Sequence, residues 1–339
     1  MNERKEFKSF IKVAGGSESQ LCHYPFKLDT YGKGCCNGCK YCFAKSVLDF
    51  RRLWDEENPS PASYEKIEKL FIDIFEKKKT RNKFYDLISN RVPIRLGGMT
   101  DCFSDIEKEK EVTYKLLKLF NKYNYPYLIL TKNTLIATDK YIEVLNKDLA
   151  VIQFSITTPY DNMSLKMEYG AEPTSERIKA INKLSKLGFY VEARINPLFP
   201  IYKDGYFTGK HNYNKKLNYF DWSLVDMLCK SGAKTIIAGF LRLSNWNIKW
   251  IKESLGEDYT WLFDENEKHK NQALHFSTEE KRYYYERIKS MCDSYGVEFS
   301  VCYDGDEDWE TFKYLWANKN DCCNALGKVK GFTKNYLHK

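Results

Sequence analysis

The sequence of 339 residues lacks the features of membrane and secreted proteins. It has no run of 18 apolar residues, which argues against a membrane-spanning helix. The first residues, MNERKEFKSFIKVAGG, are charged and contain neither the apolar stretch nor the small-residue cleavage site of a secretion signal. We therefore expect a cytoplasmic protein that has no membrane partner.

Internal repeats and low-complexity segments are also absent, which excludes solenoid and linker architectures. With 43% hydrophobic residues, the chain is long enough to bury one large α/β core. It has eleven cysteines, and in a chain of this size without a secretion signal these favour metal ligation or catalysis over disulfides. The net charge of +8 is compatible with binding to a polyanion such as nucleic acid.

Short apolar segments alternate with helical patterns. The expected strands are residues 26–31, 92–98, 126–132, 149–158, 189–197 and 233–241. Helical patterns as long as a crossover requires lie between them, over 63–78, 106–122 and 174–187. The alternation predicts an α/β fold, a partial (β/α)6 TIM-like barrel of parallel strands covered by helices.

The pattern changes after residue 245, so we expect two regions. Residues 1–245 form the barrel, and residues 246–339 form a C-terminal extension that binds substrate or closes the barrel. Within the extension, a helix is expected over 278–295 and a short strand over 298–302, followed by a polar tail that carries cysteines.

The candidate functional residues follow predicted strands, at the rim where the loops of such a barrel converge. In chain order they are Cys35, the segment 97–101, Lys132, the segment 155–158, Arg194 and Asn196.

The segment GKGCCNGCKYCFAKS contains a C-x3-C-x2-C motif, formed by Cys35, Cys39 and Cys42 within a loop over 34–43. Three thiolates leave one iron of a 4Fe-4S cluster without a protein ligand. S-adenosylmethionine (SAM) can chelate that iron through its amino and carboxylate groups and be cleaved reductively. We expect Tyr41 and Phe43 to cover the cluster.

Zinc is the alternative occupant of closely spaced cysteines. Zinc sites usually present a C-x2-C pair with a second pair of Cys or His ligands further along the chain. No second pair is evident, and the other cysteines lie far away except for Cys36, which we interpret as a bystander. The cluster is therefore the favoured interpretation.

From about residue 22 to 200 the sequence resembles the radical SAM superfamily and, within it, the spore photoproduct lyase-like branch. Besides the cysteines, the resemblance rests on GGMTDCFSDIE (97–107), LTK (130–132), FSITT (154–158) and the block MEYGAEPTSERIKAINKLSKLGFYVEARINPLFP (167–200). It implies that Lys132 pairs with the SAM carboxylate, that Ser155 is a polar contact to SAM and that Tyr41 lies against it.

The resemblance implies further cofactor contacts. Gly97 and Gly98 would bind the methionine amino group through backbone carbonyls, unless they are simply turn glycines. The remaining cofactor candidates are Phe43, Thr100 and Thr157. Strand alternation places Arg194 and Asn196 on one face, where we expect them to contact either SAM or substrate. Glu168 and Arg177 are expected to form a structural ion pair that braces the loop after the fourth strand.

The sequence departs from this family at one position. In spore photoproduct lyase a cysteine just before the strand-two Thr or Ser returns a hydrogen atom to the thymine radical, but here Met99 stands at that position. Cys102 is the candidate replacement donor, with Asp101 beside it as a second candidate catalytic residue. The alternative is that Cys102 is a buried apolar cysteine.

The C-terminal cysteines support a second hypothesis. Cys302, Cys322 and Cys323, with Cys292, could bind an auxiliary iron-sulfur cluster. The alternative is that they are buried thiols that close the barrel.

We therefore expect a radical SAM enzyme that forms a 5′-deoxyadenosyl radical and abstracts hydrogen from a nucleic acid or nucleotide base, in repair or modification. Segments 76–83 and 202–216 interleave Lys with Tyr or Asn, which suits phosphate and base contacts. An external electron donor of the flavodoxin or ferredoxin type is expected. The alternatives are modification of a peptide or small metabolite, or a non-catalytic zinc-containing nucleic-acid-binding protein.

Overall fold

The computed structural model describes most of the chain. The described residues are 11–13, 22–24, 26–49, 52–200, 202–203, 206–207, 220–257, 259–263, 273–302 and 311–333.

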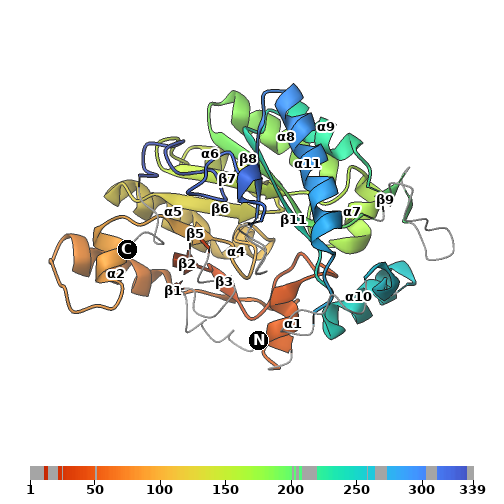
Figure 1. Cartoon of the computed structure of the whole chain (residues 1–339). Helices are drawn as coiled ribbons and strands as arrows, with labels where there is room; N and C mark the ends of the chain where they lie inside the picture. The colour runs from red at the N-terminus through yellow and green to blue at the C-terminus, as the bar shows by residue number, and fades with distance from the viewer. Residues whose placement is uncertain are drawn as a thin grey trace.

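One eight-stranded sheet organises the fold, in the order β1-β2-β5-β6-β7-β8-β11-β12 (Figure 1). Its strands are β1 (Ile11–Val13), β2 (Phe26–Leu28), β5 (Ile94–Leu96), β6 (Tyr127–Thr131), β7 (Ala150–Ser155), β8 (Tyr190–Leu198), β11 (Thr235–Phe240) and β12 (Glu298–Val301). Seven strands run parallel, while β1 pairs antiparallel with β2 at one edge. No pairing among the described strands joins the two edges, so the sheet is an open barrel.

The predicted parallel α/β fold is confirmed, and each of the six expected strands is present. The number of parallel strands is seven rather than six, because β12 pairs with β11 from Thr235↔Glu298 to Ala238↔Val301. The sequence predicted a strand there but assigned it to the extension. Nothing in the sequence shows which strand is its partner, because residues 241–297 separate β11 from β12.

Helices cover the outer face of the sheet (Figure 1). The longer ones are α2 (Tyr64–Phe75), α5 (Val112–Tyr123), α8 (Thr174–Lys186), α9 (Ser223–Lys230) and α11 (Thr278–Ser294). Helix α10 (Asn245–Leu255) is also long but lies apart from the sheet (Figure 1). Shorter helices are α1 (Phe43–Asp49), α3 (Tyr85–Ser89), α4 (Ile106–Lys110), α6 (Asp139–Ile142) and α7 (Asp161–Met167). Two small antiparallel pairs complete the structure, β3 (Tyr31–Gly32) with β4 (Ser60–Pro61) and β9 (Tyr202–Lys203) with β10 (Tyr206–Phe207). Within the described residues, no helix combines the length and the apolar character that crossing a membrane requires.

The single helix expected over 106–122 is wrong, because the chain breaks at Glu111. This residue adopts a left-handed backbone conformation with φ 53° between α4 and α5. The buried carboxylate of Glu107 accepts hydrogen bonds from the backbone N–H groups of Thr113 and Tyr114, at 2.9 and 2.8 Å. It thereby satisfies two of the free donors at the start of α5 and stabilises the break.

The interior face of the sheet is polar along its middle strands. The amide of Gln153 on β7 donates to Glu192 on β8 at 2.6 Å and accepts from Arg194 at 3.1 Å. All three side chains are buried. A polar interior distinguishes this barrel from one filled only by apolar layers.

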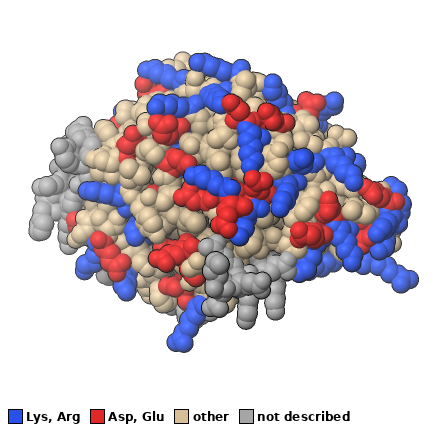
Figure 2. All heavy atoms as spheres, turned by 180° about the vertical axis from the view of Figure 1, so that it is seen from behind, with Lys and Arg blue, Asp and Glu red and all other residues tan. Residues whose placement is uncertain are grey.

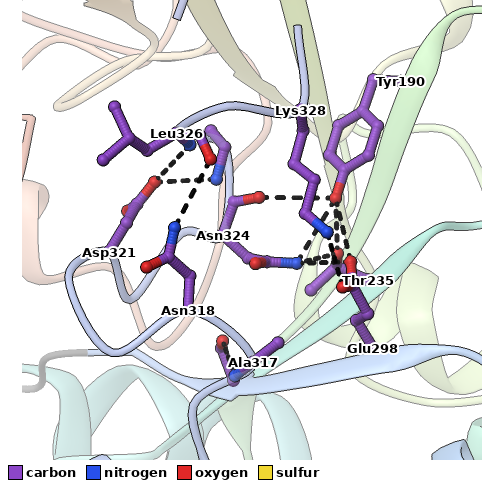
Figure 3. Close-up of polar contacts among 11 residues, drawn as sticks. Tyr190, Thr235, Glu298, Ala317, Asn318, Asp321, Asn324, Leu326 and Lys328 are labelled. Carbon is purple, nitrogen blue, oxygen red and sulfur yellow. Dashed lines mark hydrogen bonds and ion pairs between the residues drawn. The ribbon is translucent and has the colours of Figure 1, made fainter. Parts of the chain in front are cut away.

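The C-terminal tail packs under the amino ends of the strands (Figure 3). The amide of Asn324 donates to Thr235 at 2.9 Å and to Glu298 at 2.8 Å, at the starts of β11 and β12. On the other side of the opening, Tyr24 donates to the carboxylate of Asp321 at 2.6 Å. The tail thus connects the edge strand β12 to the segment that precedes β2.

Candidate functional site

The cysteine loop lies between β3 and α1, beyond the carboxyl end of β2, and docks on the segment that follows α7. The backbone N–H of Lys40 donates to the carbonyl of Met167 at 2.8 Å, and Cys39 forms an isolated antiparallel β-bridge with Glu168. The N–H of Gly170 donates to the carbonyl of Asn37 at 3.2 Å. The loop is therefore held by backbone bonds to a segment more than 120 residues away in the chain.

Glycines on both sides make this contact close. A Cβ at Gly38, where φ is +57°, would overlap the ring of Tyr169, and a Cβ at Gly170 would overlap the carbonyl oxygen of Cys36. A Cβ at Gly34 would overlap the carbonyl oxygen of Asp55. These positions require glycine because other segments of the chain pack directly against them.

The three motif thiols have an environment that suits a metal centre. Burial raises the pKa of the Cys35 thiol to about 12 and raises the pKa values of Cys39 and Cys42 as well. The ammonium of Lys132 acts in the opposite direction on the pKa values of Cys39 and Cys42. Such thiols become thiolates when a cationic centre binds them, because metal ligation displaces their protons.

The spacing of the three thiols does not suit a single zinc ion. Zn–S bonds of about 2.3 Å place the sulfurs of one tetrahedral ion ~3.8 Å apart. Across the described ranges, one group of three or more possible ligands has all its ligand atoms within 4.8 Å of one another, and it does not include these cysteines. The three cysteines therefore do not form such a compact group, and three thiolates are the donor set that would leave one iron of a cubane cluster open.

Cys36 has neighbours outside the motif. Burial raises the pKa of its thiol, and the backbone of Ile106 and the hydroxyl of Ser104 act in the opposite direction. The motif therefore offers three thiols to a cluster, and the fourth adjacent cysteine has partners elsewhere.

A buried ion pair braces the end of β7, as the sequence predicted. Arg177 and Glu168 approach to 2.6 Å, and neither side chain is exposed. Arg177 also donates to the carbonyls of Ser155 at 2.9 Å and Glu172 at 2.6 Å. The hydroxyl of Tyr41 donates to the Glu168 carboxylate. The pair thus links the cysteine loop to the strand end that carries Ser155.

Asp101 holds the carboxyl ends of two strands against the cysteine loop. Its carboxylate accepts from Asn37 at 2.9 Å, from the Thr131 hydroxyl at 2.8 Å and from the Lys132 N–H at 2.7 Å. Its own N–H donates to the Cys35 sulfur at 3.5 Å. These contacts describe a positioning residue, and its catalytic role remains a prediction.

Cys102 lies inside the hydrophobic core, with no exposed surface. Its carbonyl accepts from the Thr113 hydroxyl at 2.6 Å, and burial raises the pKa of its thiol well above the usual value. This placement corresponds to the apolar alternative that the sequence left open, and hydrogen donation from Cys102 remains a prediction.

Lys132 and Thr157 are the side chains best placed for a polar ligand beside the cysteines. The Lys132 ammonium lies 5.7 Å from the centroid of the Tyr41 ring. The buried Thr157 hydroxyl has no hydrogen-bond partner in the structure. An orphaned buried hydroxyl costs free energy unless a ligand satisfies it. Ser155, at the end of the same strand, is buried. These residues offer polar groups that SAM could use, and their contact with SAM remains a prediction.

Three other predicted cofactor contacts have protein neighbours, and a fourth is exposed. A Cβ at Gly97, where φ is +78°, would overlap the Leu130 carbonyl, and one at Gly98 would lie 3.2 Å from the Lys27 side chain. The Thr100 hydroxyl donates to the Tyr31 carbonyl. Phe43 is 57% exposed, and its expected cover of the cluster remains a prediction.

Arg194 and Asn196 share the interior face of β8, as strand alternation predicts, but they lie beside C-terminal cysteines. An Nη of Arg194 lies 2.8 Å from the Cys302 sulfur. A Cβ at Gly239 would lie 2.8 Å from the Asn196 amide and 3.4 Å from Cys302. Their predicted contact with SAM therefore remains a prediction, and the structure adds cysteine neighbours that the sequence did not suggest.

Sequence reasoning missed a pair of asparagines at the site. The amide of Asn133, after β6, donates to that of Asn37 in the cysteine loop at 2.9 Å. Both side chains are buried. Their positions next to the LTK and C-x3-C motifs were the one signal available, since asparagine in a loop is ordinarily a turn residue.

Only one of the two basic segments, 76–83, lies wholly within the described residues. Segment 202–216 lies outside the described residues except for the backbone of β9 and β10. Segment 76–83 is exposed and leads from α2 towards the amino end of the sheet, away from the cysteine loop. Figure 2 shows basic and acidic side chains interspersed over the rear face.

Comparison with known proteins gave one family and several similar folds. The family model described as Radical SAM superfamily matches residues 30–205. A search of curated proteins found no match.

Two solved structures illustrate the similarity of fold. A spore photoproduct lyase mutant with bound AdoMet and dinucleoside spore photoproduct aligns with TM-score 0.59 and 13% identity, over 87% of this chain and 79% of that one. Streptococcus suis SuiB bound to S-adenosylmethionine aligns with TM-score 0.51 and 12% identity, over 88% of this chain and 54% of that one. At these identities the likeness concerns the fold.

Proposed function

Because the chain belongs to the radical SAM superfamily, we propose that it uses Cys35, Cys39 and Cys42 to cleave SAM and that its substrate is a nucleic acid or nucleotide base. It is an enzyme, and its cofactors are a 4Fe-4S cluster and SAM. When bound, these cofactors supply a 5′-deoxyadenosyl radical that removes a hydrogen atom from the substrate.

The observation that carries the proposal is the set of three part-buried thiols of Cys35, Cys39 and Cys42, with the Lys132 ammonium close enough to lower the pKa values of two of them. Three thiolates leave one coordination position of a cubane for a small molecule, whereas a fourth would close it.

The chain's own residues then have distinct tasks. Lys132 neutralises the SAM carboxylate, and the unpartnered hydroxyl of Thr157 hydrogen-bonds to a polar group of SAM. Tyr41 packs against the ligand while its hydroxyl is held by Glu168. Asp101 holds Lys132 and the cysteine loop in position, because its carboxylate accepts from the Lys132 N–H and its own N–H donates to the Cys35 sulfur. Fixing these groups on strand ends limits the geometries in which a radical can react.

The net charge, one basic segment and a protein of similar fold support the proposal of a nucleic-acid substrate. The chain carries a net charge of +8, and segment 202–216 follows β8, whose carboxyl end lies at the same rim as the cysteine loop. The spore photoproduct lyase of similar fold was solved with a dinucleoside. Reduction requires an external electron donor, which we propose is of the flavodoxin or ferredoxin type, and we propose a cytoplasmic location.

The test is an anaerobic assay of the reconstituted chain with SAM and dithionite, in which 5′-deoxyadenosine is measured by liquid chromatography. Short oligonucleotides, with and without ultraviolet lesions, are compared with a mixture of peptides and with no addition. We expect oligonucleotide to raise 5′-deoxyadenosine above the background and to change in mass. An increase caused only by peptides or small metabolites would overturn the substrate class. A colourless zinc protein would overturn the whole proposal.

A further inference from the structure

Two basic side chains lie next to each other on the interior face of the sheet. Lys27 on β2 and Arg95 on β5 are direct partners in the parallel pairing of these strands. The residues on either side of each are completely buried in the hydrophobic core, namely Phe26, Leu28, Ile94 and Leu96. Because side chains alternate between the two faces of a strand, Lys27 and Arg95 share the opposite face, which is the inside of the barrel. We call these two residues the interior basic pair.

The interior basic pair faces the open side of the barrel. The charges of Lys27 and Arg95 both interact with the thiol of Cys302, which follows β12 at the far edge of the sheet. Both basic residues are part-buried, whereas Arg194 on the interior face of β8 is buried. Solvent therefore reaches the two cations although they lie inside the fold.

Protein groups satisfy this pair poorly. An Nη of Arg95 lies 3.7 Å from the Cys22 sulfur, and a thiol is a weak acceptor. The Nε of Arg95 is buried and has no hydrogen-bond partner. Within the ranges that the structure describes, neither Lys27 nor Arg95 has a carboxylate within 4.0 Å. A cation that has lost water without gaining an acceptor costs free energy, so the pair lacks a compensating anion.

The two positive charges also act against each other. Neighbouring strands lie about 4.8 Å apart, and like charges directly opposite on them destabilise a sheet. Burial and then the charge of Arg95 lower the pKa of Lys27, while Asp29 acts more weakly in the opposite direction. The Asp29 carboxylate accepts from the backbone N–H of Met99 at 2.9 Å. Such a local cost is typical of a functional site, where a ligand removes it.

The pair lies beside the residues expected to bind SAM. A Cβ at Gly98 would lie 3.2 Å from the Cδ atom of Lys27, so the lysine side chain runs along this glycine. Gly98 is one of the two glycines predicted to contact the methionine part of SAM. A substrate group held by Lys27 and Arg95 would thus lie inside the barrel and next to SAM, where the radical must meet its hydrogen atom.

We propose that Lys27 and Arg95 bind a phosphate group of the substrate. This inference rests on the proposed nucleic-acid or nucleotide substrate and narrows it to one that places a phosphate inside the barrel. A guanidinium binds two phosphate oxygens at once, and an ammonium adds a further charge-assisted hydrogen bond. The phosphate removes the repulsion between the two cations and gives the Nε of Arg95 an acceptor. Arg194 has other partners, since it donates to Gln153 at 3.1 Å and lies 2.8 Å from the Cys302 sulfur.

The test compares ligands that differ in the phosphate. Isothermal titration calorimetry on the anaerobically reconstituted full chain measures binding of deoxynucleosides, their 5′-monophosphates and dinucleotides joined by one phosphodiester. We expect the phosphate to strengthen binding about 10- to 100-fold, the range of a charge-assisted contact. A stronger response to monophosphates indicates a terminal phosphate, and a stronger response to dinucleotides indicates an internal phosphodiester.

The variant with Lys27→Met and Arg95→Gln should lose this preference for phosphate. Lys115→Gln, which removes an exposed lysine on α5, is the control and should keep it. Iron content and circular dichroism establish that each protein is folded and loaded. Equal binding of nucleoside and nucleotide by the wild type would overturn the inference, and so would a preference that survives the double substitution.

Lys27→Met alone gives a second measurement that needs no nucleoside. Inorganic phosphate should raise the midpoint of thermal unfolding more in the wild type than in Lys27→Met, because a ligand that binds the native state stabilises it. General stabilisation by phosphate ions acts on both proteins and cancels in this comparison. An equal shift in the two proteins would contradict a phosphate site at Lys27.

These results can be told apart from a failure of the proposed function. If phosphate binding depends on the interior basic pair but no nucleotide or oligonucleotide raises 5′-deoxyadenosine, the phosphate site stands and the nucleotide substrate is wrong. If nucleotides raise 5′-deoxyadenosine and bind equally well to the double variant, the proposed function stands and the phosphate site is wrong.

Discussion

Cys39 and Glu168 are paired by a backbone β-bridge, although 129 positions separate them in the chain. The Glu168 carboxylate binds Arg177, which in turn donates to the carbonyl at the end of β7. A predicted cluster ligand is thereby fixed to the same buried network as the strand end at which SAM is expected. The predictions below test the parts of this network separately.

Removing any one motif thiol should abolish SAM cleavage. In Cys35→Ala, Cys39→Ala or Cys42→Ala, the cluster loses one of its three protein ligands and cannot hold SAM on a stable iron. 5′-Deoxyadenosine formed under reduction should fall to the level of a reaction without enzyme. Cys36→Ala is the control and should retain activity, because the Cys36 thiol faces Ser104. Normal turnover in a motif variant would contradict the ligand assignment.

Lys132→Ala should weaken SAM binding and leave the cluster intact. Loss of a charge-assisted contact costs about 1.5–3 kcal/mol, which corresponds to roughly 10- to 100-fold in Kd. Equilibrium binding of SAM and iron content are measured together. Lys115→Ala, which removes an exposed lysine on α5, should change neither quantity. If SAM affinity is unchanged in Lys132→Ala, Lys132 does not belong to the site.

Arg177→Met should strongly destabilise the fold. It leaves the Glu168 carboxylate buried without its cation, which costs about 3–5 kcal/mol. The free energy of unfolding is measured by urea denaturation. Glu176→Gln is the control, since it breaks an ion pair with Lys179 in which the side chains are 47% and 72% exposed. That pair should contribute less than about 1 kcal/mol. Equal effects of the two substitutions would show that the buried pair has no special structural role.

Gly170→Ala should impair cluster assembly. The added methyl group overlaps the Cys36 carbonyl, so the cysteine loop must shift, at a cost of about 1–3 kcal/mol. We expect less iron per chain after reconstitution, with little change in circular dichroism. At Gly256, φ is +81° and an added Cβ meets nothing within 4 Å. Gly256→Ala should therefore cost about 1–2 kcal/mol from backbone conformation and keep its iron. Full iron loading in Gly170→Ala would show that the close packing of the loop is dispensable.

Local patterns in the sequence explain how much of the fold could be predicted. The six expected strands are apolar, rich in β-branched residues and bounded by turn signals, so each stands out without knowledge of its neighbours. The break at Glu111 could not be predicted, because it depends on the Glu107 carboxylate turning back to cap α5. The pairing of β12 with β11 could not be predicted either, because the residues of a strand do not show which other strand it pairs with.

The site likewise has features that local sequence predicts and features that depend on the tertiary structure. The sequence alone indicated the cluster ligands, because Cys35, Cys39 and Cys42 lie close together in the chain. It also predicted that Glu168 pairs with Arg177, which are nine positions apart. Sequence could not show that Asp101 binds both Asn37 and Lys132, because three loops must first converge. Nor could it show that Arg194 lies beside Cys302 and Cys323.

By itself, the sequence determined the class of chemistry and the parallel α/β architecture, because thiol spacing and hydrophobic period are local properties of the chain. The tertiary structure alone decided which polar groups are buried together, which glycines admit a neighbouring segment and which thiols share one interior space. These depend on the packing of strand ends and a tail that are remote in sequence, and burial is what gives such contacts their energetic weight.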